Sequence, residues 1–355
     1  MWCCWSHRRF PPYAPSAICL LVLVGWTLPV DRNYWREVWT ERTLLPQFAS
    51  SQFTAPSSVH AVQFAPRQRS PTFDFSAVTV PANEIHAGGP PKDGIPALTN
   101  PRFVTARNAT YLRPDDRVIG VVAAKQSKAY PLRILNYHEI INDRVGDLPV
   151  AVTYCPLCDS CALFDRRTQL GEREFGVSGL LYNSNVLMYD RGGRPESLWS
   201  QLLAQGISGP GARKPLTALP LELTSWKDWL SRYPNTTVLS VETGHQRDYS
   251  RSPYGSYFST PQLMFPVKPT SDRLPTKSRV LGVWTESSAK AYPESLFAEG
   301  QQRIEDMLDG KRIVIEFNRA ARSMRVVEAD RDVHWMYSLW FAWYALHPET
   351  DVAGR

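Results

Sequence analysis

Three cysteines lie three residues apart in the segment TYCPLCDSCALFD, residues 153–165. Cys155 and Cys158 form a Cys-x-x-Cys pair. Such a turn lets two thiolates face one metal ion, or lets one thiol resolve a disulfide made by the other. Pro156 fixes the backbone dihedral between them and lowers the cost of ordering the turn. Cys161 is the nearest third thiol, so these residues are the first candidates for chemistry.

Binding of a metal ion, zinc or copper, is the leading hypothesis for this segment. A structural zinc site takes four ligands, and the chain has no second Cys-x-x-Cys to supply them. The three thiolates and one histidine would complete a set, with His138 as the expected histidine and His245 as a further candidate. Three soft thiolates alone would also suit copper(I). If the metal is catalytic, Glu139 is the candidate base.

Thiol–disulfide exchange is the second hypothesis, with Cys155 as nucleophile and Cys158 as resolving thiol. The CPLC motif resembles that of glutaredoxins. In thioredoxin-like folds this chemistry uses a long helix whose N-terminus lowers the thiol pKa, whereas the residues after Cys158 predict a hairpin. A third interpretation is that the cysteines are buried as small apolar side chains. The sequence leaves open whether the protein is an enzyme.

A polar loop is predicted at FGVSGLLYNSN, residues 175–185, where small and polar residues lie between expected strands. Loops of this kind often carry ligands. Ser178, Tyr182 and Asn183 are the candidate substrate-binding residues, and they define a further alternative, a non-catalytic binding module. The sequence has no P-loop, dinucleotide fingerprint, nucleophile elbow or His-Glu-x-x-His motif.

An internal repeat is the main clue to the elements that position these residues. RVIGVVAAKQSKAYP at 117–131 matches RVLGVWTESSAKAYP at 279–293, and WKDWLSRYPNTTV at 226–238 shares the pattern W-x-x-W-x-x-x-x-P-x-T-x-V with WFAWYALHPETDV at 340–352. The strand motif precedes the tryptophan motif in both copies, as in an internal repeat. We therefore predict two related β-rich halves from an internal duplication, at about 100–240, with the cysteine site, and about 270–355.

The fold class predicted from these patterns is α+β, with short packing helices. Residues 132–143 have helical periodicity, and 148–154 predict a strand entering the cysteines. Residues 224–233 predict a short helix whose tryptophans pack in the core. ALFDRR and REFGVSG, separated by TQLGE, predict a hairpin. ESLWSQLL, residues 196–203, predicts a further short helix.

The N-terminus predicts export. Arg8 and Arg9 precede an uncharged segment, residues 14–30, of the kind found in signal peptides and short membrane anchors. Residues 1–30 are therefore predicted to be a signal peptide or an N-terminal transmembrane anchor, 31–83 a linker and 84–355 one folded domain. The membrane is the expected partner of this segment, and the expected location is extracytoplasmic, periplasmic or cell-surface.

The charge balance does not favour nucleic acid as a partner. The net charge is +6, but lysines and arginines are scattered and form no basic run. The hydrophobic content of 43% is sufficient for a folded core. The other cysteines, Cys3, Cys4 and Cys19, lie in or before the apolar segment and are not expected to take part in the mature fold.

Several long motifs resemble an uncharacterised family, domain of unknown function 3179. They are GGPPKDGIP, AYPLRILNYHEIIND, VTYCPLC, FGVSGLLYNS, LMYDR, SLWSQ and WFAWYALHP. The resemblance covers about residues 84–352. It implies a bacterial or archaeal protein, often exported, whose activity is not established.

The family pattern centres on His138 and Glu139, on Cys155 and Cys158, and on the FGVSG and YNS segments. This chain departs from the pattern at two positions. Cys161 stands where the family usually has a small residue, and Thr99 stands where an Asp is usual. The resemblance therefore supports the first two thiols more strongly than the third.

Overall fold

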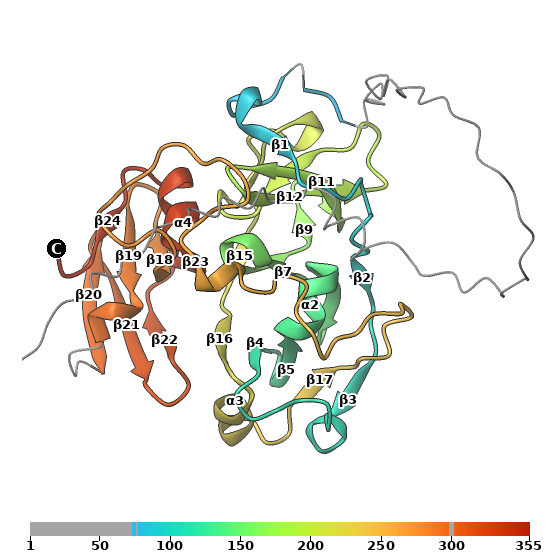
Figure 1. Cartoon of the computed structure of the whole chain (residues 1–355), viewed down its shortest axis with the longest axis vertical. Helices are drawn as coiled ribbons and strands as arrows, with labels where there is room; N and C mark the ends of the chain where they lie inside the picture. Colours follow the sequence, from blue (N-terminus) through green and yellow to red (C-terminus); the bar gives the residue numbers. More distant parts are fainter. Residues whose placement is uncertain (1–72, 76, 298–301) are drawn as a thin grey trace, which may run out of the picture.

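The computed structural model describes residues 73–75, 77–297 and 302–355. In this part of the chain β-sheet dominates and the helices are short, as the α+β prediction requires (Figure 1). The predicted export segment and most of the predicted linker lie outside these residues. Within the described ranges no helix is long and apolar enough to span a membrane.

The largest sheet crosses both halves of the chain. Its strands follow the order β2-β6-β7-β8-β23-β18-β19-β24, and β15 also pairs with β8. The bounds are Leu98–Thr99 (β2), Ile140–Val145 (β6), Leu148–Cys155 (β7), Ser160–Asp165 (β8), His334–Leu339 (β23), Arg279–Trp284 (β18), Ala289–Pro293 (β19), Asp351–Val352 (β24) and Ala218–Leu219 (β15). The antiparallel pairing of β8 with β23 joins the cysteine segment to the C-terminal half.

Two smaller sheets complete the two halves. One has the order β16-β4-β5-β17-β3, and the other has the order β20-β21-β22. The bounds are Glu222–Ser225 (β16), Arg117–Ala123 (β4), Gln126–Pro131 (β5), Thr237–Leu239 (β17), Phe103–Thr105 (β3), Arg303–Leu308 (β20), Lys311–Asn318 (β21) and Ser323–Ala329 (β22). Figure 1 shows β4 and β5 at the opposite end of the molecule from β11 and β12.

A five-stranded sheet, β1-β11-β12-β13-β14, covers the cysteine segment. Its strands are Ile85–Ala87 (β1), Glu174–Tyr182 (β11), Asn185–Arg191 (β12), Leu198–Ser200 (β13) and Gln205–Gly206 (β14). A two-stranded ribbon of Arg167–Thr168 (β9) and Gly171–Glu172 (β10) precedes it. Except for β1, these strands lie between the two repeated motifs of the first half, where 95 positions separate Pro131 from Trp226, against 47 between Pro293 and Trp340 in the second half.

The helices are short and pack on the sheets. The α-helices are α2 (Leu132–His138), α3 (Trp226–Arg232) and α4 (Trp340–Leu346). The 3-10 helices are η1 (Ala82–Glu84), η2 (Ala106–Asn108), η3 (Pro156–Cys158), η4 (Gly209–Gly211), η5 (Tyr257–Ser259) and η6 (Glu294–Phe297). Trp229 of α3 and Trp343 of α4 are fully buried, which confirms that the repeated tryptophans are core residues.

The repeated motifs occupy matching elements with matching contacts. The indole N–H of Trp229 donates to Thr236 Oγ1 at 3.0 Å, and that of Trp343 donates to Thr350 Oγ1 at 3.0 Å. Each indole packs flat on a strand glycine, Gly120 of β4 or Gly282 of β18, which leaves no room for a Cβ atom there. Glycine is therefore required by close packing at both positions.

The match extends to the hairpin that carries the cysteines. Tyr130 and Lys128 both donate to Asp143 Oδ2, at 2.7 and 2.8 Å, before β7. In the second half Tyr292 donates to Asp306 Oδ2 at 2.9 Å, and Lys290 lies 2.7 Å from it, before β21.

The tips of the two hairpins also match. Asp159, at the tip between β7 and β8, has φ +45°, and Arg322, at the tip between β21 and β22, has φ +47°. The β21–β22 hairpin thus has a connection of the same length, ending in the same positive φ, as the cysteine hairpin, but it carries no cysteine.

Two local predictions are wrong and a third is only partly right. The helix expected over 132–143 ends at His138, because Glu139 takes φ +56° and the chain continues as β6. Residues 196–203 contain β13, where Trp199 is buried between strands. ALFDRR and REFGVSG do pair next to TQLGE, through the β9–β10 ribbon and the bond from Arg173 N to Arg166 O. The hairpin does not extend further, because β8 pairs with β7 whereas β11 belongs to the covering sheet.

We predict that Gly120→Ala and Gly282→Ala each lower the free energy of unfolding by about 1–3 kcal/mol, the usual cost of overpacking a core. An ideal Cβ atom would lie 2.1 Å from the Trp229 ring in one case and 2.3 Å from the Trp343 ring in the other. Urea denaturation measures the change. Val122→Ala, on the same strand as Gly120 and 49% exposed, is the control. If Gly120→Ala and Gly282→Ala lower the free energy of unfolding no more than Val122→Ala does, the close packing is contradicted.

Candidate functional site

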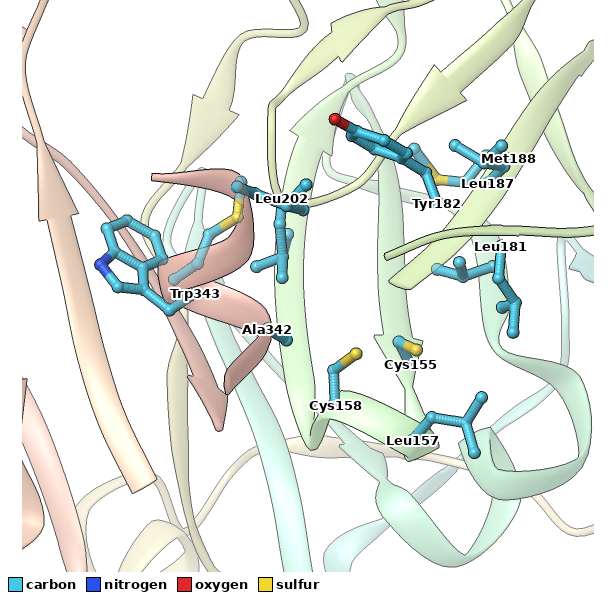
Figure 2. Packing of buried hydrophobic residues seen from close by; sticks show 14 of the residues in the cluster. Cys155, Leu157, Cys158, Leu181, Tyr182, Leu187, Met188, Leu202, Ala342 and Trp343 are labelled. Carbon is cyan, nitrogen blue, oxygen red and sulfur yellow. The ribbon is translucent and has the colours of Figure 1, made fainter. Parts of the chain in front are cut away.

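The candidate site lies at the tip of the cysteine hairpin, which we define as β7, η3 and β8. Cys155 ends β7 and Cys158 ends η3, and both side chains are at most 1% exposed. Figure 2 shows the two sulfur atoms on the same side of the turn, facing the space that Leu181 enters from β11. We call Cys155 and Cys158 the sulfur pair.

The turn between β11 and β12 supplies the partner of the sulfur pair. Asn183 and Ser184 both have positive φ, +48° and +66°, as a two-residue hairpin turn requires. The Cys158 thiol donates to the backbone oxygen of Ser184 at 3.2 Å, and the Cys155 sulfur lies 3.7 Å from the same oxygen. The covering sheet therefore closes the site from above.

The two thiols differ in electrostatic environment. Burial by itself raises the pKa of Cys155. Hydrogen bonds from the Cys158 thiol and from the backbone N–H groups of Cys158, Val186 and Leu157 outweigh burial, so the pKa lies below its usual value. Burial raises the pKa of Cys158 well above its usual value, and the charge on Cys155 raises it further. One sulfur thus favours the thiolate and its neighbour keeps its proton.

A buried carboxyl group, that of Glu139, lies close enough to Cys155 for charges on the two groups to interact. Burial raises its pKa well above the ordinary value, the charge on Cys155 raises it further, and a hydrogen bond from Tyr254 opposes the shift. The backbone of Glu139, at φ +56° and ψ −35°, is in a region that costs most residues about 1–3 kcal/mol. Its N–H donates to Leu135 O and its carbonyl accepts from Tyr154 N, and these bonds hold the strained geometry.

A cavity of about 40 Å³ reaches this carboxyl group. Its inner wall is buried and consists of Glu139, Leu157, Val186 and Tyr254 with Ile95, Val177 and Leu181. Its outer wall is partly exposed and consists of Gly88, Pro90, Gly179, Leu180 and Phe265. The cavity therefore leads from the surface of the covering sheet to Glu139, Leu157 and Val186, but neither sulfur of the pair lines it.

An ion cluster fixes the tip of the hairpin from the opposite side. Asp159 follows Cys158 and is 2% exposed. Arg117 Nη1 contacts its two carboxylate oxygens at 2.7 and 2.9 Å, and Arg279 Nε contacts one of them at 3.1 Å. Tyr154 donates a further hydrogen bond at 2.9 Å. Burial opposes ionisation of Asp159, but the two arginines hold its pKa below the usual value.

His138 points away from the sulfur pair. Its Nδ1 lies 2.7 Å from Pro96 O and its Nε2 lies 2.6 Å from the Tyr249 hydroxyl, so both ring nitrogens have protein partners. The ring of His245 lies near it, tilted by 52°, at 5.3 Å between centroids. Burial lowers the pKa of His138 to about 4, so the ring is neutral at neutral pH.

Cys161 faces the other side of the sheet. It pairs with Tyr154 on β7, one position away from Cys155, and successive side chains of a strand point to opposite faces. It packs in the core beside Tyr337, whereas the sulfur pair packs with β11 and β12. Burial raises the pKa of Cys161, which makes it an inert thiol.

The structure does not bring the predicted metal ligands His138, Cys155, Cys158 and Cys161 together. Among the described residues, no group of three or more His, Cys, Asp or Glu side chains is placed to hold a metal ion. We therefore do not treat these four residues as a metal centre. The predicted base, Glu139, does lie beside the sulfur pair.

The predicted substrate-binding residues occupy the covering sheet and make internal contacts. Ser178 Oγ donates to Leu187 O at 2.5 Å across a bulge in β11. Asn183 donates to Glu84 at 3.0 Å and accepts from Lys268 N at 2.8 Å. Tyr182 is buried. The segment is a strand and a tight turn rather than an open loop, and its binding role stays a prediction.

Sequence reasoning missed Asp159, Ser184 and Tyr254. Asp159 had a usable signal, because both copies of the repeated motif begin with arginine and two such arginines need an acidic partner. Ser184 and Tyr254 had none, since their roles depend on contacts between segments far apart in the chain.

Comparison with protein families gives one match, over residues 92–337, to the family described as protein of unknown function (DUF3179). The chain belongs to this family. The match contains both thiols of the sulfur pair, Glu139 and both arginines of the ion cluster. Comparison with curated proteins and with solved structures gave no match.

We predict that Asp159→Asn lowers the free energy of unfolding by about 2 kcal/mol or more. The substitution leaves the charges of Arg117 and Arg279 beside a neutral group. Because both arginines are partly exposed, the loss of unfolding free energy stays below that of breaking a fully buried ion pair. Urea denaturation at pH 7 checks this. Because the folded pKa of Asp159 is depressed, its contribution is present above the unfolded pKa of about 3.9 and is lost as the pH falls below that value.

The control is Asp165→Asn at the far end of β8, whose partner Arg167 is 60% exposed. A surface pair of this kind contributes little. Equal losses in the two variants would contradict a special role for Asp159.

We predict a second pH effect at His138. Its folded pKa of about 4 lies below the unfolded value of about 6.5, a difference of about 3 kcal/mol. This stability is fully present above pH 6.5 and is lost progressively as the pH falls towards 4. His138→Gln should therefore flatten the fall in unfolding free energy between pH 7 and 4.5. The slope will not vanish, because His347 is buried with the same pKa. If the unfolding free energy of His138→Gln falls with pH as steeply as that of the parent chain, the prediction is contradicted.

Proposed function

We propose that the sulfur pair is a thiol–disulfide redox couple, with Cys155 as nucleophile and Cys158 as resolving thiol. The observation that carries this proposal is the contrast between the two buried sulfurs. Backbone N–H groups of Leu157 and Val186 point at Cys155, while the single proton of Cys158 lies between two acceptors, Ser184 O and the Cys155 sulfur. A thiolate beside a protonated thiol is the arrangement that disulfide formation requires.

The means of lowering the thiol pKa differs from that of thioredoxin-like folds. A helix dipole is absent at this turn, because η3 has only three residues. Direct hydrogen bonds to the sulfur replace it, and they are stronger inside a protein than at its surface. Glu139 would serve as the proton carrier, since a buried carboxyl group that keeps its proton at neutral pH can donate it.

The expected thermodynamic result is a reversible two-electron couple. After equilibration of the full-length chain in dithiothreitol redox buffers, peptide mass spectrometry should find one internal disulfide, Cys155–Cys158. Cys155→Ser and Cys158→Ser should each abolish it, and Cys161→Ser should not. Cys3, Cys4 and Cys19 are replaced by serine in every sample, so that any disulfide found involves Cys155, Cys158 or Cys161.

The thiolate itself is measured by absorbance near 240 nm. Cys155 should ionise below the ordinary thiol pKa of about 8.5, and the signal should be absent in Cys155→Ser. Cys155→Ser/Cys158→Ser, analysed for metal content beside the parent chain, tests the zinc or copper alternative. About one equivalent of metal in the parent, lost in the variant, together with no internal disulfide, would overturn the redox proposal.

We also propose that the protein works outside the cytoplasm, held at the membrane by residues 14–30. The support is the sequence of that segment, which follows Arg8 and Arg9. A buried dithiol that needs an oxidant is compatible with such a location. Recovery of the full-length chain in the soluble cytosolic fraction would contradict the proposal.

We infer that the two halves arose by internal duplication. The support is the set of matched contacts: two tryptophans on two glycines, two Lys–Tyr–Asp clusters and two hairpin tips with one residue at positive φ. Only the first half received the inserted strands β11–β14. The paired glycine variants described above test whether the two packing sites are energetically equivalent, and clearly unequal costs would weaken the inference.

A further inference from the structure

We propose that a groove in the second half of the chain binds a small phosphate monoester with an aromatic group. The groove is lined by η6, by the segment that leads into β18 and by the turn between β21 and β22, and its volume is about 700 Å³. Figure 1 shows β18, β21 and β22 on the same side of the molecule. Neither sulfur of the pair lines this groove, so the inference stands apart from the proposed redox function.

The walls of the groove are mainly basic. Lys277, Arg279, Arg319 and Arg322 line it, and Glu294 is the one acidic residue among them. Arg322 Nη2 lies 2.8 Å from one carboxylate oxygen of Glu294, and Arg279 Nη1 lies 3.9 Å from the other. The single negative charge is therefore already compensated, and the groove presents an excess of positive charge to a ligand.

Lys277 has no carboxylate partner among the described residues. Its Nζ donates to the backbone oxygens of Tyr257 and Gln262, at 2.5 and 2.7 Å, and lies 3.4 Å from the centre of the Tyr257 ring. An ammonium group has three N–H donors, so one is left for a ligand. Burial lowers the pKa of Lys277, and an anion beside it would favour the charged form.

The first half of the chain provides a comparison, because the matching positions there are acidic. Alignment of the two copies of the repeated strand motif places Lys277 where the first half has Asp115. Alignment of the two hairpins places Arg322 where the first half has Asp159. The shared elements form with either sign of charge, so the fold itself does not require the two bases. Their presence at one groove favours a ligand of negative charge.

Phosphate fits these donors better than a carboxylate does. Lys277 and Arg279 belong to the segment that leads into β18, whereas Arg322 belongs to the turn between β21 and β22. A carboxylate offers two oxygens in one plane, whereas a phosphate monoester has three strong acceptor oxygens and can meet donors from several elements. A guanidinium group has five N–H donors, more than the contacts to Glu294 use, and it binds phosphate with two of them.

The size and the aromatic lining of the groove indicate that the phosphate carries an organic group. A volume of about 700 Å³ lies in the range of small-molecule sites and is far larger than a phosphate ion needs. Phe258 is 41% exposed and Phe317 is partly exposed, and both line the groove. A flat apolar group packed on these rings would remove them from water. Phenyl phosphate is therefore a suitable probe.

Isothermal titration calorimetry of the full-length chain with phenyl phosphate tests the inference. The titration is made at low ionic strength and about pH 8, where the ester carries two negative charges. One equivalent should bind, about two- to tenfold tighter than inorganic phosphate, because the ring adds contacts with the aromatic wall. Phenyl sulfate carries one charge and should bind more weakly. Added salt should weaken the binding of phenyl phosphate, since the groove is open to solvent.

Variants of the lining separate the charge from the ring. Arg322→Gln should weaken the binding of both phenyl phosphate and inorganic phosphate by about tenfold or more, the usual effect of losing a hydrogen bond between charged groups. Phe258→Ala should weaken only the binding of phenyl phosphate, by about two- to tenfold. Both side chains are largely exposed, so both variants should fold, and urea denaturation checks this. Arg279 is left unchanged because it also contacts Asp159.

The matched control is Arg107→Gln, which removes the same charge from an exposed residue of η2, outside the groove. It should leave both affinities unchanged. Equal losses in Arg107→Gln and Arg322→Gln would mean general attraction by the net charge and would overturn the inference. No saturable binding of phenyl phosphate by the parent chain, or unchanged binding by a folded Arg322→Gln variant, would also overturn it. None of these outcomes affects the Cys155–Cys158 couple, which is measured separately.

Discussion

The contact of Asp159 with Arg117 and Arg279 is the interaction on which the rest of the site depends. The two arginines begin the two copies of the repeated motif, and they converge on one buried carboxylate at the tip of the cysteine hairpin. The two guanidinium charges repel each other, and the carboxylate between them compensates that repulsion. The ion cluster therefore joins the two halves and fixes the direction in which Cys158 leaves the turn.

Once the hairpin tip is fixed, the covering sheet determines the hydrogen bonds that the sulfurs make and excludes water from them. The turn at Asn183 and Ser184 places a carbonyl oxygen over both sulfurs, and β12 brings the N–H of Val186 to Cys155. Excluding water strengthens these bonds, and it also makes an uncompensated charge costly. Ionisation of one sulfur therefore opposes ionisation of the other, and the backbone N–H groups favour Cys155.

The sequence allowed several of these features to be predicted. The repeated tryptophans and strand motifs identified the scaffold, because equivalent packing sites in the two halves need the same residue types. The turn at Cys155 and Cys158, and the acid at Glu139, were found because their residue types are chemically distinctive. The error at residues 132–143 arose because a strained φ at Glu139 ends the helix, and periodicity contains no sign of such strain. His138 and Cys161 were misplaced as ligands because the side of a sheet that a residue faces depends on pairing across distant strands.

The β21–β22 hairpin has a consequence for how this protein can be studied. Its connection has the same length as that of the cysteine hairpin, with Arg322 at the position of Asp159 and Asn318 at the position of Cys155. The two tips differ in burial: residues 155–160 are buried, whereas residues 318–320 and 322 are exposed. The molecule therefore carries a related turn once in solvent and once under the covering sheet, and amide exchange compared at the two tips would report how much protection that cover adds.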